Sequence, residues 1–271
     1  MDYLARESSP IEPGIWEQID AAIVKAARNV LAGRRMLQLF GPLGVGVESI
    51  HIDDAQEKDE VIEDGFITTK GRKLVEIPTI YEDFSLFAKD LAGSEKSGYP
   101  LDLSKVLTAA QALALKEDRL IFFGSQKLGY EGLLTTSGAS KLKKKDWSTG
   151  ENAFADVAAA IETLVSSGVY GTYALVLSPS LYMQLQRQQP GTGLLEIDRV
   201  SKLLNGHVYK TPVLGKDQAV LLCPQAENMD LVVGQDMAAA YLEQRELNHY
   251  FRVLETVLLR IKRKQAIVAF E

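Results

Sequence analysis

The chain has 271 residues, 46% of them hydrophobic, which is enough apolar surface for one large folded unit or two modest ones. Thirty-six acidic against thirty basic residues give a net charge of −6, which argues against broad non-specific binding to nucleic acid. The single Cys223 cannot form a disulfide within the chain, and the charged start MDYLARESSPIEPG lacks the apolar core of a secretory signal. We therefore expect a soluble protein of the reducing cytoplasm without a membrane-spanning segment.

Two segments carry the spacing of amphipathic helices. Residues 15–31 repeat apolar side chains at steps of three and four, and Gly33 follows as a terminator. Residues 102–123 do the same, with Asp102 as a candidate N-cap and Gly124 as a stop. At 1.5 Å per residue, the second helix would be a rod of roughly 30 Å. We predict that this helix is the spine from which loops and sheets extend.

Between the two helices, the pattern from residue 47 to 81 is typical of strands. Seven acidic residues lie between Asp53 and Asp64, and the return limb carries Lys70, Arg72 and Lys73. This predicts a long hairpin whose oppositely charged limbs meet a neighbouring copy of the protein. A solvated, mobile hairpin is the alternative. The following stretch, YEDFSLFAKDLAGS, is predicted as a short helix with Phe84, Phe87, Ala88 and Leu91 inward.

The second half of the chain divides into an α/β lobe and a strand-rich end. Residues 152–224 predict a helix ending at Gly168, the strand TYALVLS, a helix opened by Pro179, a turn at PGTG, a short helix near Val200, and the strands HVYKT and QAVLLC. The lysine-rich run KLKKKDW before this lobe favours a solvated loop over a nucleic-acid patch. After residue 225, the runs MDLVVG, MAAAYLEQ, HYFRVLETVLLRIKR and AIVAF predict one antiparallel sheet.

No segment carries a recognisable catalytic motif. The three histidines are scattered without metal-ligand spacing, GPLGVGVES matches no phosphate-binding loop, and GxSxG is absent. Glu117 and Asp118 are adjacent on the spine helix and point about 100° apart, so they make a poor acid–base pair. We expect them to form salt bridges with a neighbouring subunit. We predict no catalytic residues, no metal site and no enzyme activity of the chain itself.

Four separated blocks, in the same order, resemble family 1 encapsulin shell proteins. They are PIEPGIWEQIDAAIVKAARNVLAGRRMLQLFGPLG (10–44), EDRLIFFGSQKLGYEGLL (117–134), GTYALVLSPSLY (171–182) and VGQDMAAAYLE (233–243). The resemblance implies an α+β protein with the Hong Kong 97-type phage major capsid protein fold. It also implies an N-terminal arm and helix at 1–46, an E-loop at 47–80, a P-domain with the spine helix at 81–134, an A-domain at 135–225, and the C-terminal part of the P-domain sheet at 226–271.

The same resemblance implies two sites. In encapsulins, a short C-terminal targeting peptide of the cargo docks between the N-terminal helix and the P-domain sheet, which here corresponds to Ala27, Leu31, Arg34, Gln38, Asp236, Met237 and Ala238. The five-fold pore loop corresponds to Pro190, Gly191, Thr192 and Gly193. Some relatives bind flavin through an aromatic residue near 80–90, for which Tyr81 is the candidate. No other cofactor is expected.

The function implied by the resemblance is that of an icosahedral, cytoplasmic nanocompartment. YEGLLTTSG and LNHYFRVLETVLLRIKR resemble most closely the subgroup that encloses ferritin-like iron-oxidising cargo, which implies iron storage and protection from oxidative stress. Peroxidase cargo is one alternative, and a prophage major capsid protein that packages DNA is another. The compact length, the lack of an N-terminal scaffolding extension and the negative charge favour the encapsulin. The expected partners are further copies of the chain and the cargo protein, without nucleic acid or membrane.

Overall fold

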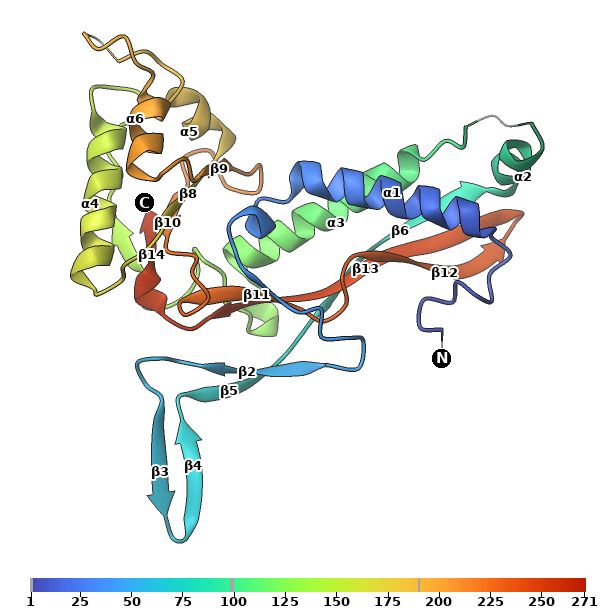
Figure 1. Ribbon diagram of the computed structural model, residues 1–271, viewed down its shortest axis with the longest axis horizontal. Helices are drawn as coiled ribbons and strands as arrows, with labels where there is room; N and C mark the ends of the chain where they lie inside the picture. Colours follow the sequence, from blue (N-terminus) through green and yellow to red (C-terminus); the bar gives the residue numbers. More distant parts are fainter. Residues whose placement is uncertain (1, 98–99, 190) are drawn as a thin grey trace.

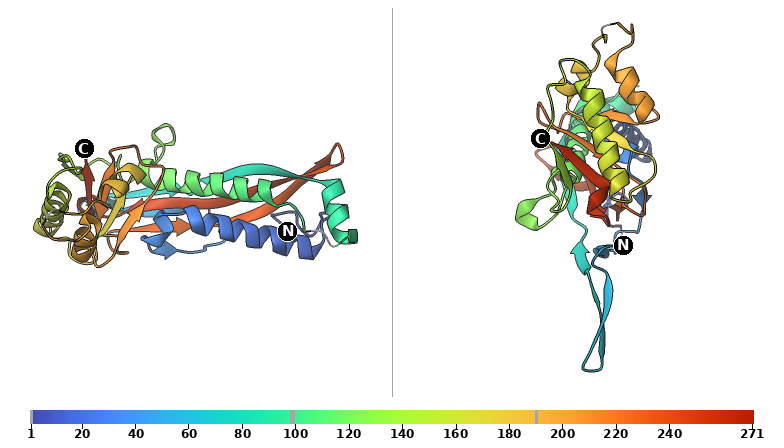
Figure 2. Two further views of the ribbon diagram at one scale, coloured as in Figure 1. Left: turned by 90° about the horizontal axis from the view of Figure 1, so that it is seen from above. Right: turned by 90° about the vertical axis from the view of Figure 1, so that its left-hand side faces the viewer.

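The computed structural model describes residues 2–97, 100–189 and 191–271. It has three parts, which Figure 1 shows side by side: a long arm of helices on a sheet, a second lobe with its own sheet, and a narrow ribbon that projects from the region where the arm and the lobe meet. The view from above in Figure 2 shows that the arm and the second lobe lie end to end. The molecule is therefore elongated, and much of its chain is close to a surface.

The arm is built on a sheet whose long strand is β13 (Asn248–Ile261). This strand pairs antiparallel with three others along its length. The three are β6 (Thr79–Phe87), β11 (Met229–Val233) and β12 (Ala238–Arg245). The short β1 (Leu39–Phe40) pairs parallel with β11. β13 alternates buried and half-buried residues at its start and is largely buried from Val253 onward, because its other face there packs against apolar residues at the base of the ribbon.

Two long helices pack on this sheet, and both were predicted. α1 (Pro13–Val30) begins at a proline, which is favourable in a first helical turn, and buries the stripe that includes Ile15, Ile19 and Ile23. α3 (Ser104–Phe123) ends at Gly124, whose φ of 61° favours glycine. α3 begins two residues later than expected, and the Asp102 carboxylate accepts the Ser104 N–H at 2.9 Å. The spine helix is thus confirmed with a shifted start.

The helix predicted for residues 81–94 is wrong in its first half. Residues 79–87 form β6, and the helix α2 (Ala88–Ser97) starts only afterwards. The burial in β6 alternates, so that Phe84 and Leu86 are buried while Phe87 is 41% exposed. Phe84 stacks on Phe251 of β13 with ring centroids 5.1 Å apart. Pairing along β13 therefore overrides the local helical spacing, because it satisfies the backbone and buries the Phe84 ring.

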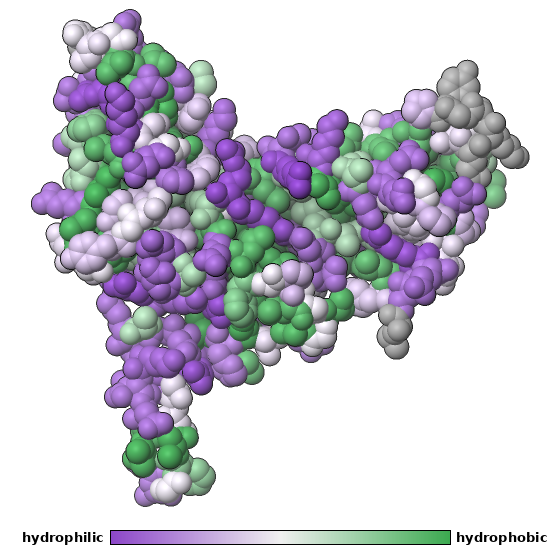
Figure 3. All heavy atoms as spheres, in the orientation of Figure 1, coloured by the Kyte–Doolittle hydropathy of each residue, from purple (hydrophilic) through white to green (hydrophobic). Residues whose placement is uncertain are grey.

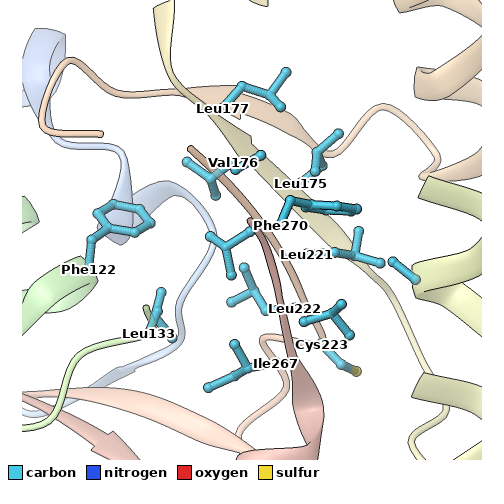
Figure 4. Packing of buried hydrophobic residues seen from close by; sticks show 14 of the residues in the cluster. Phe122, Leu133, Leu175, Val176, Leu177, Leu221, Leu222, Cys223, Ile267 and Phe270 are labelled. Carbon is cyan, nitrogen blue, oxygen red and sulfur yellow. The ribbon is translucent and has the colours of Figure 1, made fainter. Parts of the chain in front are cut away.

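The second lobe is a mixed sheet with helices around it. Its strands, in order across the sheet, are β7 (Ser140–Leu142), β14 (Ile267–Phe270), β10 (Ala219–Leu222), β8 (Ala174–Leu177) and β9 (Val208–Lys210). The helices are α4 (Asn152–Ser166), α5 (Pro179–Gln184) and α6 (Glu196–Leu203). Figure 4 shows the apolar side chains of β8, β10 and β14 packed together with Phe122 and Leu133. The helices and strands predicted for residues 152–224 are confirmed.

One strand of the C-terminal region lies outside the sheet that the sequence predicted. β14 pairs antiparallel with β10 and parallel with β7, so it belongs to the second lobe rather than to the sheet of the arm. All four of its residues are buried. A strand buried on both faces fits the interior of a helix-covered sheet. The prediction that the last four strands form one antiparallel sheet is therefore wrong for β14.

The ribbon confirms the predicted strands between residues 47 and 81. β2 (Ser49–Asp53) pairs with β5 (Arg72–Glu76), and β3 (Asp59–Glu63) pairs with β4 (Phe66–Lys70). Asp53 accepts hydrogen bonds from Arg72 at 2.7 Å and Lys58 at 2.6 Å, so part of the charge pairing expected with a neighbour is made within the ribbon. Its far end is apolar, as the green atoms at the bottom of Figure 3 show, with Ile62, Phe66 and Ile67 66–72% exposed. An exposed apolar patch of this kind is typical of a contact surface.

Candidate functional site

A groove with a volume of about 430 Å³ lies between α1 and the loop that precedes β12. Its walls combine apolar side chains with three arginines and one acidic residue. The lining residues are Ile23, Val24, Ala27, Arg28, Leu31, Arg34, Arg35, Leu39, Asp236 and Met237. They come from one helix, the η1 turn (Gly33–Arg35), the start of β1 and the loop before β12. The groove therefore brings together segments that lie some 200 residues apart in the sequence.

The structure brings five of the seven residues expected to bind a cargo peptide to this groove. Ala27, Leu31, Arg34, Asp236 and Met237 line it. The other two lie nearby and do not line it. Gln38 is exposed and its carbonyl accepts the Leu231 N–H at 2.9 Å, while Ala238 begins β12 and pairs with Leu254.

Arg34 is held by three carboxylates at the base of the groove. Its Nε donates to Glu117 at 2.9 and 3.0 Å, its Nη1 to Asp236 at 2.7 Å, and its Nη2 to Glu255 at 2.6 Å. Glu117 comes from α3 and Glu255 from β13, and both are fully buried. The guanidinium therefore joins α1's end, the spine helix and the central strand in one buried ion cluster.

The charges in this cluster change the pKa of two groups. Burial alone would lower the pKa of Arg34. The carboxylates of Glu117, Glu255 and Asp236 have the opposite and larger effect, so the pKa of Arg34 is raised above its ordinary value. Burial, followed by the Glu117 charge, raises the pKa of Glu255 well above its ordinary value of 4.5. The Glu255 Oε2 atom accepts from Arg34, whereas its buried Oε1 atom has no hydrogen-bond partner among the described residues. Glu255 therefore keeps its proton where an exposed glutamate has lost it.

Replacing Glu255 with glutamine is expected to flatten the pH dependence of stability. The native chain holds a Glu255 proton that the unfolded chain releases, so stability is lost as pH rises from 4.5 through the higher native pKa. Glutamine cannot release that proton, and its amide oxygen can still accept from Arg34. The unfolding midpoint of E255Q should fall less than that of the unmodified chain between about pH 4 and about pH 8. Calorimetry with E162Q, an exposed glutamate on α4, provides the control; equal slopes in all three proteins would contradict the prediction.

Asp118, next to Glu117, serves a different structural purpose. Its carboxylate accepts the backbone N–H groups of Ala32 and Gly33 at 2.9–3.1 Å and the Thr211 hydroxyl at 3.0 Å. Burial raises the pKa of Asp118 to about 6, against the opposite effect of these donors. Both acids of the spine helix are fully buried and have their partners within the chain. The expectation that Glu117 and Asp118 bridge to a neighbouring subunit is therefore wrong.

Some groove residues were not predicted from the sequence. Val24 and Arg28 lie four residues apart on one face of α1, a signal that was available. Arg35 lies in the turn after α1, and Leu39 is the first residue of β1. The acid Glu255 sits among apolar residues in HYFRVLETVLLRIKR, and an acid in a buried strand indicates a buried partner.

The residues expected at a pore lie in the turn between α5 and α6, at the outer end of the second lobe in Figure 1. Pro190 lies outside the described residues. Gly191 and Gly193 both have positive φ values, of 79° and 70°, and the Thr192 hydroxyl donates to the Gln189 carbonyl at 3.1 Å. The flavin candidate Tyr81 lies on β6, with the Arg252 guanidinium 3.8 Å from its ring centroid.

The described part of the chain lacks two features, a cluster of metal ligands and a membrane-spanning helix. Among these residues, no three His, Cys, Asp or Glu side chains are grouped so that they could hold a metal ion. None of the helices formed by the described residues is both long and apolar enough to cross a membrane.

The fold defines a structural class, the capsid-type fold. A virus-like particle protein from Pyrococcus furiosus superposes with a TM-score of 0.77, covering 95% of this chain and 99% of that one at 21% identity. The capsid protein of Myoviridae phage XM1 gives a TM-score of 0.62 at 14% identity, covering 88% of this chain and 90% of that one. The expected α+β, Hong Kong 97-type capsid fold is confirmed.

Sequence comparison assigns the family within that class. Residues 1–258 match the family described as "Encapsulating protein for peroxidase". The chain is 39% identical, over its whole length and 96% of the relative, to the type 1 encapsulin shell protein EncA of Myxococcus xanthus. A diheme-cytochrome–encapsulin shell fusion protein of Kuenenia stuttgartiensis is 39% identical over 94% of this chain and 72% of that protein. A ferritin-like–encapsulin shell fusion protein of Pyrococcus furiosus is 25% identical over 59% of this chain and 46% of that protein.

The chain belongs to the type 1 encapsulin shell protein family. Its copies assemble into a nanocompartment that encloses cargo. Shell proteins of this kind are structural, so the surfaces that matter are those that contact other copies and the cargo.

Proposed function

We propose that the nanocompartment formed by this chain lies in the cytoplasm and encloses a ferritin-like, iron-oxidising cargo protein, and that it stores iron and limits oxidative stress. The chemistry takes place in the cargo, and the shell chain holds the cargo and controls access. A short C-terminal targeting peptide of the cargo binds in the groove between α1 and the loop before β12. This groove is the observation that carries the proposal.

The groove has the properties that a short peptide requires. Val24, Ala27, Leu31 and Met237 offer an apolar surface that can bury small aliphatic side chains. The Arg34 ion cluster at the base fixes the distance between α1 and the loop before β12, so the groove is formed before the peptide arrives. A preformed groove loses little conformational entropy on binding, which favours affinity for a short segment.

Two observations bear on the cargo. One relative is named as a fusion of a ferritin-like protein with an encapsulin shell, which supports an iron-oxidising cargo. The family description names a peroxidase, which makes peroxidase cargo the second candidate. Particles purified from the native host should contain a ferritin-like protein by mass spectrometry and an iron-rich core by electron microscopy. A haem-containing cargo without iron cores would favour the peroxidase, and nuclease-resistant DNA inside the particles would favour a capsid that packages a genome.

Placing acidic side chains in the groove is expected to empty the shells without preventing assembly. Val24 is 46% exposed, and Met237 is half-buried where it packs against the core below the groove, so V24D/M237D changes the groove surface and particle assembly must be checked alongside cargo loading. An aspartate in the groove offers the peptide no apolar surface to pack against. Binding of the peptide would also remove water from the new carboxylate, which costs free energy. Cargo per shell, measured by densitometry of purified particles, should fall at least about tenfold, because two apolar contacts are lost.

The matched control places the same charge at an exposed valine outside the groove. Val165 on α4 is 40% exposed and does not line the groove. V165D shells should load cargo normally. Normal loading of V24D/M237D, with intact particles in both cases, would contradict the binding of cargo in this groove.

We also propose that the expected domain boundaries hold apart from β14, which belongs to the sheet of the second lobe.

We propose further that the turn at Gly191–Gly193 lines a pore at a five-fold axis. Two glycines flank Thr192, which leaves one small side chain at the constriction. Replacing Thr192 with tryptophan should slow the uptake of ferrous iron by loaded shells, measured as the oxidation rate at limiting iron. Thr192→Ser is the control of similar size. Equal rates for both variants would place the route for iron elsewhere.

A further inference from the structure

A second cavity, of about 480 Å³, adjoins the peptide groove where the C-terminal end of α1 approaches the second lobe (Figure 1). Its lining combines two cations, two amide side chains and several apolar groups. The residues are Asn29, Val30, Arg35, Gln111, Leu115, Pro179, Tyr182, Met183, Lys210 and Pro212. Among the described residues that line this cavity, none is acidic. We refer to it as the cation cavity.

Unlike Arg34, the two cations of this cavity are not neutralised by carboxylates of the described residues. Arg34 is surrounded by three carboxylates and has no capacity left for a charged ligand. Arg35 and Lys210 are exposed, and neither forms an ion pair with any described residue. Instead, the Arg35 guanidinium lies 5.3 Å from the Tyr209 ring centroid and the Lys210 ammonium 4.5 Å from that of Tyr182. These aromatic contacts hold both cations at the cavity while their positive charge remains available.

The cation cavity and the peptide groove are neighbours. Arg35 lines both of them, and neighbouring residues of α1 line each. The groove follows α1 from Ile23 to Leu31, which at 1.5 Å per residue is about 12 Å. An extended peptide covers that length with roughly four residues. The residues that flank a bound four-residue segment therefore reach Arg35 and Lys210.

We propose that the peptide bound in the groove carries a carboxylate beside its apolar segment, and that Arg35 and Lys210 bind this carboxylate. The inference rests on the proposed function of the groove and specifies the chemistry of its occupant. Two cations with amide donors from Asn29 and Gln111 suit one carboxylate, and the apolar walls from Val30, Leu115 and Met183 suit the stem that carries it. A nucleic-acid phosphate chain fits less well, because it requires a row of cations and the wall between is apolar.

Two sources can supply the carboxylate, an acidic side chain or the C-terminus of the cargo. A library of random tails separates them. A fluorescent protein carrying eight randomised C-terminal residues is produced together with the full shell chain, and the tails that co-purify inside intact particles are sequenced. A second library places a constant Gly-Ser extension after the randomised residues, so that the terminal carboxylate is moved away.

The expected result is enrichment of a short apolar run flanked by Asp or Glu, or by the chain terminus in the first library only. In R35Q/K210Q shells, the ratio of acidic to basic tails should fall roughly tenfold, since two exposed ion pairs are lost. K25Q/K202Q, which removes two exposed cations that line neither cavity, should leave that ratio unchanged.

Three other results of the library experiment would overturn the proposal, each in a different way. Enrichment of apolar tails flanked by Lys or Arg, or with no charge preference, overturns the carboxylate while leaving the groove as a peptide site. Enrichment of no tail at all overturns the groove itself. RNA that co-purifies with unmodified shells and is lost from R35Q/K210Q shells, with the tail preference unchanged, assigns the two cations to phosphate and overturns the proposal.

Discussion

Replacing Arg34 with glutamate is expected to prevent accumulation of folded shell protein rather than to release cargo from intact shells. The substitution removes the only cation within hydrogen-bonding distance of Glu117 and Glu255 among the described residues and adds a further acid beside them. Both glutamates are fully buried, and breaking a buried ion pair by removing one partner costs about 3–5 kcal/mol. That is comparable with the whole stability of many domains. Soluble yield and particle formation on a sizing column would both fall.

Two further variants show whether charge is the cause. Arg34→Lys keeps the charge but not the fork that binds three carboxylates, so shells should form with a lowered unfolding temperature. The triple variant R34M/E117L/E255M replaces the charged cluster with apolar groups and should recover most of the yield lost by Arg34→Glu. Normal yield of Arg34→Glu shells would show that the cluster contributes little to folding.

Replacing Asp118 with alanine is expected to have the second largest effect on folding. The substitution leaves two backbone N–H groups, of Ala32 and Gly33, and the Thr211 hydroxyl without their common acceptor in a buried place. Each unsatisfied buried donor costs about 1–3 kcal/mol, so the free energy of unfolding should fall by about 3 kcal/mol or more. The affected groups connect the end of α1 to the second lobe. The loss should appear in calorimetry as a lower unfolding temperature.

A milder substitution and a partner substitution provide the controls. Asp118→Asn retains one acceptor oxygen for the two N–H groups and should lose less stability than Asp118→Ala. Thr211→Val removes one of the three donors at nearly constant volume and should cost the least. If Asp118→Ala and Thr211→Val destabilise equally, the backbone hydrogen bonds are not the main contribution of Asp118.

The sequence predicted the regular elements best where burial follows a local period. α1, α3 and α4 follow from apolar residues at steps of three and four, and the fully apolar runs gave β8 and β10. Those patterns report which face of a segment is buried. They do not report what covers it, which is why β14 was assigned to the wrong sheet and β6 to a helix.

The candidate site likewise contains residues that the sequence indicates and partners that it does not. The resemblance of residues 10–44 and 233–243 to encapsulins led to Arg34, Asp236 and Met237, and the structure places all three at one groove. The other half of the Arg34 cluster could not be found in this way. Glu117 and Glu255 lie 83 and 221 positions away from Arg34, and nothing local distinguishes an acid that pairs within the chain from one that pairs with a neighbour.

The sequence by itself determined the family, the helical and strand segments with strong local periods, and the region of α1 that forms the groove. The tertiary structure alone decided which buried acids share Arg34, that Asp118 joins the two lobes, and that Arg35 and Lys210 meet beside the groove. The physical reason is that local periodicity encodes burial through the hydrophobic effect, which is non-directional. Ion pairs and hydrogen bonds are directional and act over a few ångströms, so their partners are set only when distant segments are packed together.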